Sequence, residues 1–390
     1  MAGATICKCL NRAMGTSLAG FLAVGVHWVA SQSGEKFEPI IMGAAVFLLA
    51  SAATFSRFIP AIKARFDYGA MIFILTFCLV SVSGYRVEKL LVMAQERLST
   101  IIIGTALCIL TSMLVFPIWA GNELHLLITR NMDKLANSLD CCVTVYLSES
   151  GSITSGDEDL NKRMPAYKCV LNSKATEDSM AAFARWEPAH GRFSFQHPWK
   201  QYLKIGASMR SCAYCIETLN SCINLENQAP EFLKNHVHET CLRVSSKSSS
   251  ILRELAKSIT TMTLSSTIDI SIEEVNNAVV DLQNDLEALP GLLISPPVTE
   301  AKTAQNEKAE PILTTTITPL VDIIPLVTVA SLLIEITGRI EDIVDAVEEL
   351  SDLAQFKPAS DEKPKQNQSN QNIVPDQQKD NETMKALQRV

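Results

Sequence analysis

The chain has 390 residues, of which 47% are hydrophobic and 19% are charged, and its sequence pI is about 5.4. Residues 1–122 contain nine Lys or Arg and five Asp or Glu, whereas the rest of the chain contains 25 basic and 37 acidic residues. An apolar, basic first third excludes a single soluble domain, and an acidic remainder without a basic stripe excludes a nucleic-acid-binding protein.

The apolar first third contains four stretches without a charged residue. A helix needs roughly 18 to 20 such residues to cross about 30 Å of hydrocarbon, and each stretch reaches that length. We therefore predict a transmembrane domain over residues 1–122, with four spans at about 13–34, 39–56, 68–85 and 98–120.

Basic residues in the loops orient these spans. A cytosolic N-terminus places seven basic residues inside and four outside, which also makes the C-terminal region cytosolic. Arg86 and Arg97 then lie on the unfavoured side, at facing ends of two consecutive spans, where rings of Arg or Lys are one way to select anions. We predict that Arg86 and Arg97 line an anion pore, assisted by Lys8 and Arg12 at its inner mouth.

The remainder of the chain is predicted to be helical. Apolar residues recur every three or four positions from Ile268 to Leu289, which indicates a seam that needs a partner helix. A second apolar stripe runs from Leu326 to Leu350, with acidic residues on the opposite side. The predicted fold is therefore all-α, with a helical cytosolic domain over 123–356 and a disordered tail over 357–390.

Catalytic and metal-binding motifs are absent from the sequence, so we expect no enzyme and no cofactor. Cys212 and Cys215 form a C-x-x-C pair, but their helical spacing is typical of a packed helix face, and the histidines downstream fit no zinc finger. Glu35, Glu38 and Glu88 are scattered over two loops and define no cation site. We therefore predict that the chain holds no metal.

One segment resembles a known family. The string WEPAHGRF at 186–193, continuing to HPWKQY at 197–202, is similar to the W-E-P signature of the plant aluminium-activated malate transporters. Residues 47–58, 331–336 and 345–350 resemble the same family, and the resemblance covers residues 3 to 356. It implies a passive channel for malate and inorganic anions, built as a dimer, at the plasma membrane rather than the vacuolar membrane.

The resemblance also implies a departure from the family. Its members carry six spans, and residues 3–12 are similar to the cytosolic end of their second span. The first span and most of the second are therefore expected to be missing. Two other functions stay open: a non-conducting or regulatory partner that forms heterodimers with complete channels, and an organic-acid exporter.

The W-E-P segment has two interpretations. Its aromatic residues alternate with Pro188, Gly191 and Pro198, which favours a rigid connector that opens a helix near Trp199 and joins the cytosolic domain to the pore. The structural or gating residues would be Trp186, Glu187, Pro188, His190, Gly191 and Arg192. Direct binding of an anion by His190 and Arg192 is the alternative.

Overall fold

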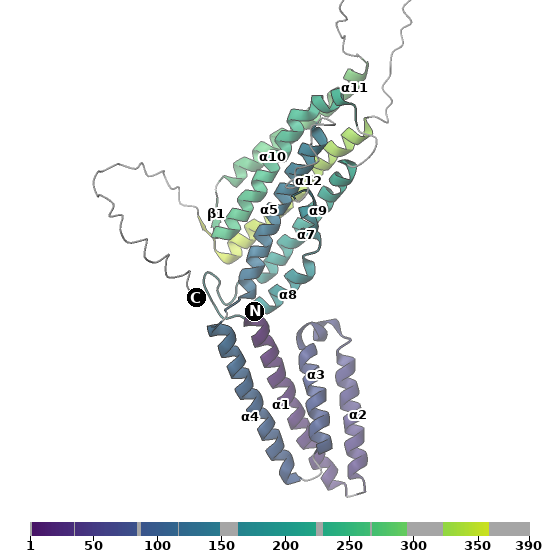
Figure 1. Cartoon of the computed structure of the whole chain (residues 1–390), viewed down its shortest axis with the longest axis vertical. Helices are drawn as coiled ribbons and strands as arrows, with labels where there is room; N and C mark the ends of the chain where they lie inside the picture. The colour runs from purple at the N-terminus through teal and green to yellow at the C-terminus, as the bar shows by residue number, and fades with distance from the viewer. Residues whose placement is uncertain are drawn as a thin grey trace, which may run out of the picture.

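A computed structural model describes most of the chain, and its elements are almost all helices (Figure 1). The described residues are 2–34, 36–83, 87–115, 117–148, 163–223, 229–265, 267–294 and 323–358. The longer helices are α1 (Ala2–Gln32), α2 (Glu38–Ser56), α3 (Pro60–Ser83), α4 (Val87–Leu114), α5 (Ala120–Leu147), α8 (Lys174–Ala184), α9 (Trp199–Ile223), α10 (Glu231–Thr261), α11 (Ile268–Ile294) and α12 (Ile324–Ala354). The short elements are η1 (Met164–Ala166), α7 (Tyr167–Leu171), β1 (Thr263–Leu264) and β2 (Lys357–Pro358). The predicted all-α fold is confirmed.

Helices α1 to α4 form an N-terminal group in which α1 packs against α3 and α4, and α2 packs against α3 (Figure 1). The contact between α1 and α3 is close. The Asn11 side-chain amide donates to the Arg65 carbonyl over 2.7 Å, and a Cβ at Gly15 would lie 2.5 Å from the Gly69 carbonyl oxygen. Glycine at position 15 is therefore required by the packing of these two helices.

The outer surface of this N-terminal group is apolar. Helix α2 has no buried residue, and Phe47 and Phe55 are each at least 70% exposed. Helices α1 and α2 are long and apolar enough to cross a membrane, and α4 contributes a shorter apolar part, Leu98–Leu114. Two of the four predicted spans thus coincide with helices of that length and composition, while those in α3 and α4 stay predictions.

The last predicted span extends too far. Helix α4 ends at Leu114 and α5 begins only at Ala120, so the last residues of the apolar run around 98–120 lie beyond the end of α4. Pro117 lies between them. Because proline has no N–H and its ring disfavours a helical residue before it, the helix ends although the apolar composition continues.

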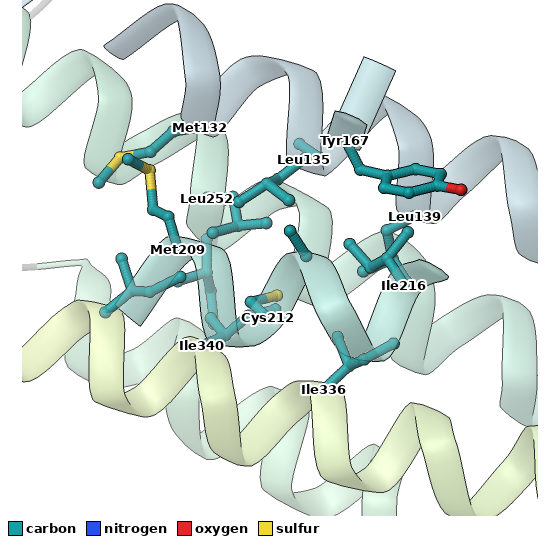
Figure 2. Close-up of a cluster of buried hydrophobic side chains, with 14 of the residues drawn as sticks. Met132, Leu135, Leu139, Tyr167, Met209, Cys212, Ile216, Leu252, Ile336 and Ile340 are labelled. Atoms are coloured by element: carbon teal, nitrogen blue, oxygen red, sulfur yellow. The ribbon is translucent and has the colours of Figure 1, made fainter. Parts of the chain in front are cut away.

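Helices α5 to α12 form a second, C-terminal bundle with its own hydrophobic core. Figure 2 shows where its central helices meet, with Leu135 of α5, Cys212 of α9 and Ile340 of α12 among the buried side chains. Burial raises the pKa of the Cys212 thiol to about 12, so the thiol remains protonated at neutral pH. Cys212 therefore occupies a packed position in the core.

The two predicted apolar stripes find their partners inside this bundle. Ile268, Val275, Leu282 and Leu289 are buried, and α11 packs chiefly on α10 of the same chain. The stripe of α12 packs mainly on α9 and is buried almost throughout. Both stripes thus serve packing within one chain.

The bundle ends in a short parallel β pair. Met262 after α10 and Gln355 after α12 both have positive φ, which ends each helix in a left-handed turn. Thr263 then pairs with Lys357, and Leu264 pairs with Pro358. The first two residues of the predicted disordered tail therefore form β2, because the two helix ends meet there. Residues 295–322 and the rest of the predicted tail, 359–390, lie outside the described residues.

Candidate functional site

One buried carboxylate joins the two helix groups. Glu187, 3% exposed, follows the end of α8, and its Oε1 accepts hydrogen bonds from the Ala120 N–H over 2.6 Å and the Gly3 N–H over 3.2 Å. Its Oε2 accepts from the Gly121 N–H over 3.0 Å. These donors lie in the first turns of α1 and α5, where a negative charge is favoured by the helix dipole. A single side chain therefore caps one helix of each group.

Two glycines allow this close approach. A Cβ at Gly3 would lie 2.3 Å from the Phe183 carbonyl oxygen, and a Cβ at Gly121 would lie 2.4 Å from the Cη2 atom of Trp199. Neither position has room for a larger residue. The Ala2 N–H also donates to the Ile118 carbonyl over 2.7 Å, so the start of α1 is held by the segment between α4 and α5.

His190 covers the carboxylate. Its ring stacks on Trp119 with centroids 4.0 Å apart, and its Nδ1–H faces the Pro188 carbonyl at 2.9 Å. Nε2 lies 4.0 Å from Oε2 of Glu187. The turn that places His190 depends on Gly191, whose φ of +57° favours glycine. His190 therefore lies between Trp119 and the Glu187 carboxylate and forms part of the junction.

The Arg192 side chain makes a hydrogen bond to the end of α10. Its guanidinium donates to the Thr260 carbonyl over 2.9 Å, in the last turn of α10, where a cation is favoured by the helix dipole. A cavity of about 400 Å³ lies beside Arg192 and His190. The geometry thus gives Arg192 a capping role at α10 as well as a position on the cavity wall.

An aromatic cluster supports the segment after the turn. Phe193 and Trp199 are buried with ring centroids 5.1 Å apart, and the Tyr202 hydroxyl lies 3.0 Å from His125 Nδ1 and 3.2 Å from His197 Nε2. Burial lowers the pKa of His125 and of His197 to about 4. Both histidines are therefore neutral at pH 7 and act as hydrogen-bonding core residues.

The connector packs through only part of its aromatic residues. Trp186 and Phe195 are 42% and 68% exposed, whereas Phe193 and Trp199 are buried. Phe195 lies in a tight turn that is closed by the bond from the His197 N–H to the Ser194 carbonyl, and this turn directs it outward. Of the W-E-P triplet, Glu187 provides the side chain that accepts hydrogen bonds from both helix groups.

Of the four predicted pore residues, the structure describes the side chains of two, Lys8 and Arg12. Lys8 and Arg12 are exposed on α1, about 8 and 14 Å along its axis from Gly3. Arg86 and the side chain of Arg97 lie outside the described part of the structure. The structure thus brings the W-E-P residues together and leaves the pore assignment of the four cations as a prediction.

Sequence reasoning missed Gly3, Gly121 and Trp119 as parts of this junction. No periodic pattern marks them, because their role depends on residues 66 to 184 positions away. The available signal was weak: two glycines at the starts of long helices, and an acidic residue between a helix end and a proline.

Substitution of Gly121 by alanine tests how tight the junction is. We expect Gly121→Ala to lower the free energy of unfolding by about 1–3 kcal/mol, because its Cβ overlaps Trp199, whose ring is packed against Phe193 and Tyr202. Thermal unfolding of the purified full chain measures the change.

Gly338→Ala is the matched control. Gly338 lies within α12 with open space around its Cβ position, so alanine there is expected to stabilise the helix by about 0.5–1 kcal/mol. Equal unfolding midpoints for the two variants would contradict the close contact between Gly121 and Trp199.

The chain is similar to known proteins over most of its length. The model of the family described as "Aluminium activated malate transporter" matches residues 1–315 and 296–351. Aluminum-activated malate transporter 10 of Arabidopsis thaliana is 50% identical over 383 residues, which is 95% of this chain and 76% of the relative. Aluminum-activated malate transporter 2 of Arabidopsis thaliana is 42% identical, over 91% of this chain and 66% of the relative. Aluminum-activated malate transporter 1 of Triticum aestivum is 39% identical, over 93% and 74%.

Proposed function

The chain belongs to the aluminium-activated malate transporter family, and from that premise we propose that it is a subunit of a passive malate and anion channel in a plant membrane. Lys8 and Arg12 carry this proposal. Both are exposed on α1, which is long and apolar enough to cross a membrane. Both precede the predicted span 13–34, at its inner end, where positive charge favours the entry of an anion into a water-filled path.

The proposed arrangement has four spans in α1 to α4 and a cytosolic C-terminal bundle. Arg86 and Arg97 would provide positive potential at the outer end of the path, and Lys8 and Arg12 would provide it at the inner end. Two subunits, identical or related, would complete the channel. The resemblance of residues 34–39 to the family supports the plasma membrane.

The membrane potential suffices to drive malate outward. Each elementary charge gains about 2.3 kcal/mol per 100 mV, so a doubly charged anion gains roughly 4.6 kcal/mol. Passive flow therefore requires no nucleotide, and no catalytic residue enters the mechanism. What the chain supplies is a path with positive potential and a junction that holds this path to the cytosolic bundle.

The Glu187 junction is the proposed route by which the C-terminal bundle affects the pore. Because one carboxylate caps both α1 and α5, a displacement of α5 changes the position of the helix that carries Lys8 and Arg12. Gating by the bundle would act through this contact.

Reversal of the charge at Arg12 tests the channel. In oocytes loaded with malate, we expect Arg12→Glu to reduce the malate current about tenfold or more, because a negative charge at the inner mouth repels the anion. Arg12 is exposed, so its replacement removes no core packing. Voltage-clamp recording, with surface expression measured in parallel, gives the result.

Lys168→Glu, on the exposed surface of α7, is the control for net charge and is expected to leave the current unchanged. Equal currents for the two variants would contradict the pore role of Arg12. A chain that is silent alone but suppresses the current of a co-expressed complete relative would instead be a regulatory partner. Malate efflux without a measurable channel current would indicate an exporter.

A further inference from the structure

A groove with a volume of about 820 Å³ lies between α1, α2 and α3 of the N-terminal group. Small residues of all three helices are part of its lining: Gly15 of α1, Ala52 and Ala53 of α2, and Gly69 and Ala70 of α3. Its larger lining side chains are apolar. A groove of this chemistry accepts a hydrocarbon chain.

The length of the groove matches one leaflet of a bilayer. Its lining on α3 extends from Ile62 to Phe73, which corresponds to about 16 Å along the helix axis. The hydrocarbon core of a bilayer is about 30 Å thick, so one leaflet accounts for about half of it. The Ile62 end lies on the side of the C-terminal bundle, because Asn11, which also lines the groove there, bonds to Arg65 and is in the same helix as Gly3.

Positive charge gathers at that end. Three lining residues, Ser56, Ile62 and Phe66, are direct sequence neighbours of Arg57, Lys63 and Arg65. Arg57 is paired with Asp67 over 2.7 Å, whereas Lys63 and Arg65 are exposed and form no ion pair within the described residues.

An apolar groove with two exposed cations close in sequence to its lining at one end is complementary to an anionic amphiphile. Basic pockets between membrane helices on the cytosolic side are suited to anionic headgroups, and the cytosolic leaflet carries the anionic lipids. We propose that the groove between α1, α2 and α3 is a binding site for an anionic phospholipid, with one acyl chain in the groove and the headgroup phosphate at Lys63 and Arg65. The site rests on the proposed membrane placement of α1 to α3 and is independent of conduction.

Lipid binding to the purified full chain tests the site. The protein in detergent is titrated with phosphatidic acid and, separately, with phosphatidylcholine of the same acyl chains, and bound lipid is counted by native mass spectrometry. We expect tighter binding of phosphatidic acid. The double variant Lys63→Gln/Arg65→Gln is expected to weaken phosphatidic acid binding about thirtyfold and to leave phosphatidylcholine binding unchanged.

A second variant tests the contribution of the groove to lipid binding without changing the cations. Ala52→Phe fills the groove from α2 without altering a cation and is expected to weaken the binding of both lipids, whereas Ala44→Phe, exposed on the same helix outside the groove, is the matched control. Lys168→Gln/Lys257→Gln, two exposed lysines of the C-terminal bundle, controls for net charge.

Four results would overturn the proposal. Equal binding of the two lipids by the unmodified chain would contradict a contact between the headgroup and the cations. Normal lipid binding by Ala52→Phe would contradict binding of the acyl chain in the groove. Displacement of phosphatidic acid by free malate or inorganic phosphate would assign the cations to a soluble anion. Loss of a dimer in Ala52→Phe, with no change in bound lipid, would assign the groove to a second copy of the chain. The lipid experiment measures bound lipid and no current. Failure of the channel proposal therefore leaves its result unaffected, and failure of the lipid site leaves the malate current unaffected.

Discussion

Replacement of Glu187 by glutamine is expected to lower the free energy of unfolding of the full chain by about 2–4 kcal/mol. The carboxylate accepts from the N–H groups of Gly3, Ala120 and Gly121 in a site that is almost fully buried. Glutamine offers one acceptor oxygen, turns an NH₂ group towards these donors, and carries no charge to interact with the two helix dipoles.

Thermal unfolding in detergent should then show a midpoint lower by about 2–5 °C. Glu123→Gln is the matched control, because it makes the same chemical change in the first turn of α5 at a side chain that caps neither helix, and it is expected to have little effect. If the junction couples the bundle to the pore, Glu187→Gln also lowers the malate current per channel at the surface.

Glu187→Asp tests whether the negative charge of the side chain or its length is what stabilises the junction. Aspartate retains the negative charge but is shorter by one methylene group, so we expect it to retain the contact with α5 only in part and to fall between the unmodified chain and Glu187→Gln. Equal unfolding midpoints for Glu187→Gln and Glu123→Gln would contradict the role of Glu187 as a shared cap.

Replacement of Arg210 by methionine is expected to destabilise the C-terminal bundle by about 3–5 kcal/mol. Arg210 pairs with Glu177 over 2.6 Å, and the side chain of Glu177 is 1% exposed. Without Arg210, the carboxylate keeps a hydrogen bond from Ser173 but loses its charged partner. An unpaired buried charge carries a large desolvation penalty.

The double variant Glu177→Met/Arg210→Met is expected to recover most of the lost stability, because it leaves no buried charge. Lys174→Met is the control. Lys174 pairs with Asp178 on the exposed face of α8, where a single ion pair contributes about 0–1 kcal/mol. Equilibrium unfolding of the three variants by denaturant measures these differences. A double variant no more stable than Arg210→Met would show that shape, and not charge, determines the cost.

The local patterns of the sequence predicted the elements well where burial is periodic. The spacing of Leu326 to Leu350 predicted which face of α12 is buried, because a helix repeats its faces every 3.6 residues. The same reasoning predicted the buried seam of α11. It failed at Pro117, where composition continued across a helix end.

The sequence by itself therefore determined the helices, their buried faces, the apolar and basic character of the first third and the family. Tertiary structure alone decided which helix each face meets, as with α11 on α10, and the role of Glu187. Burial of a helix face leaves a repeating signal in neighbouring residues. A carboxylate that caps two helices leaves none, since its donors come from distant parts of the chain and converge only when both helix groups have folded.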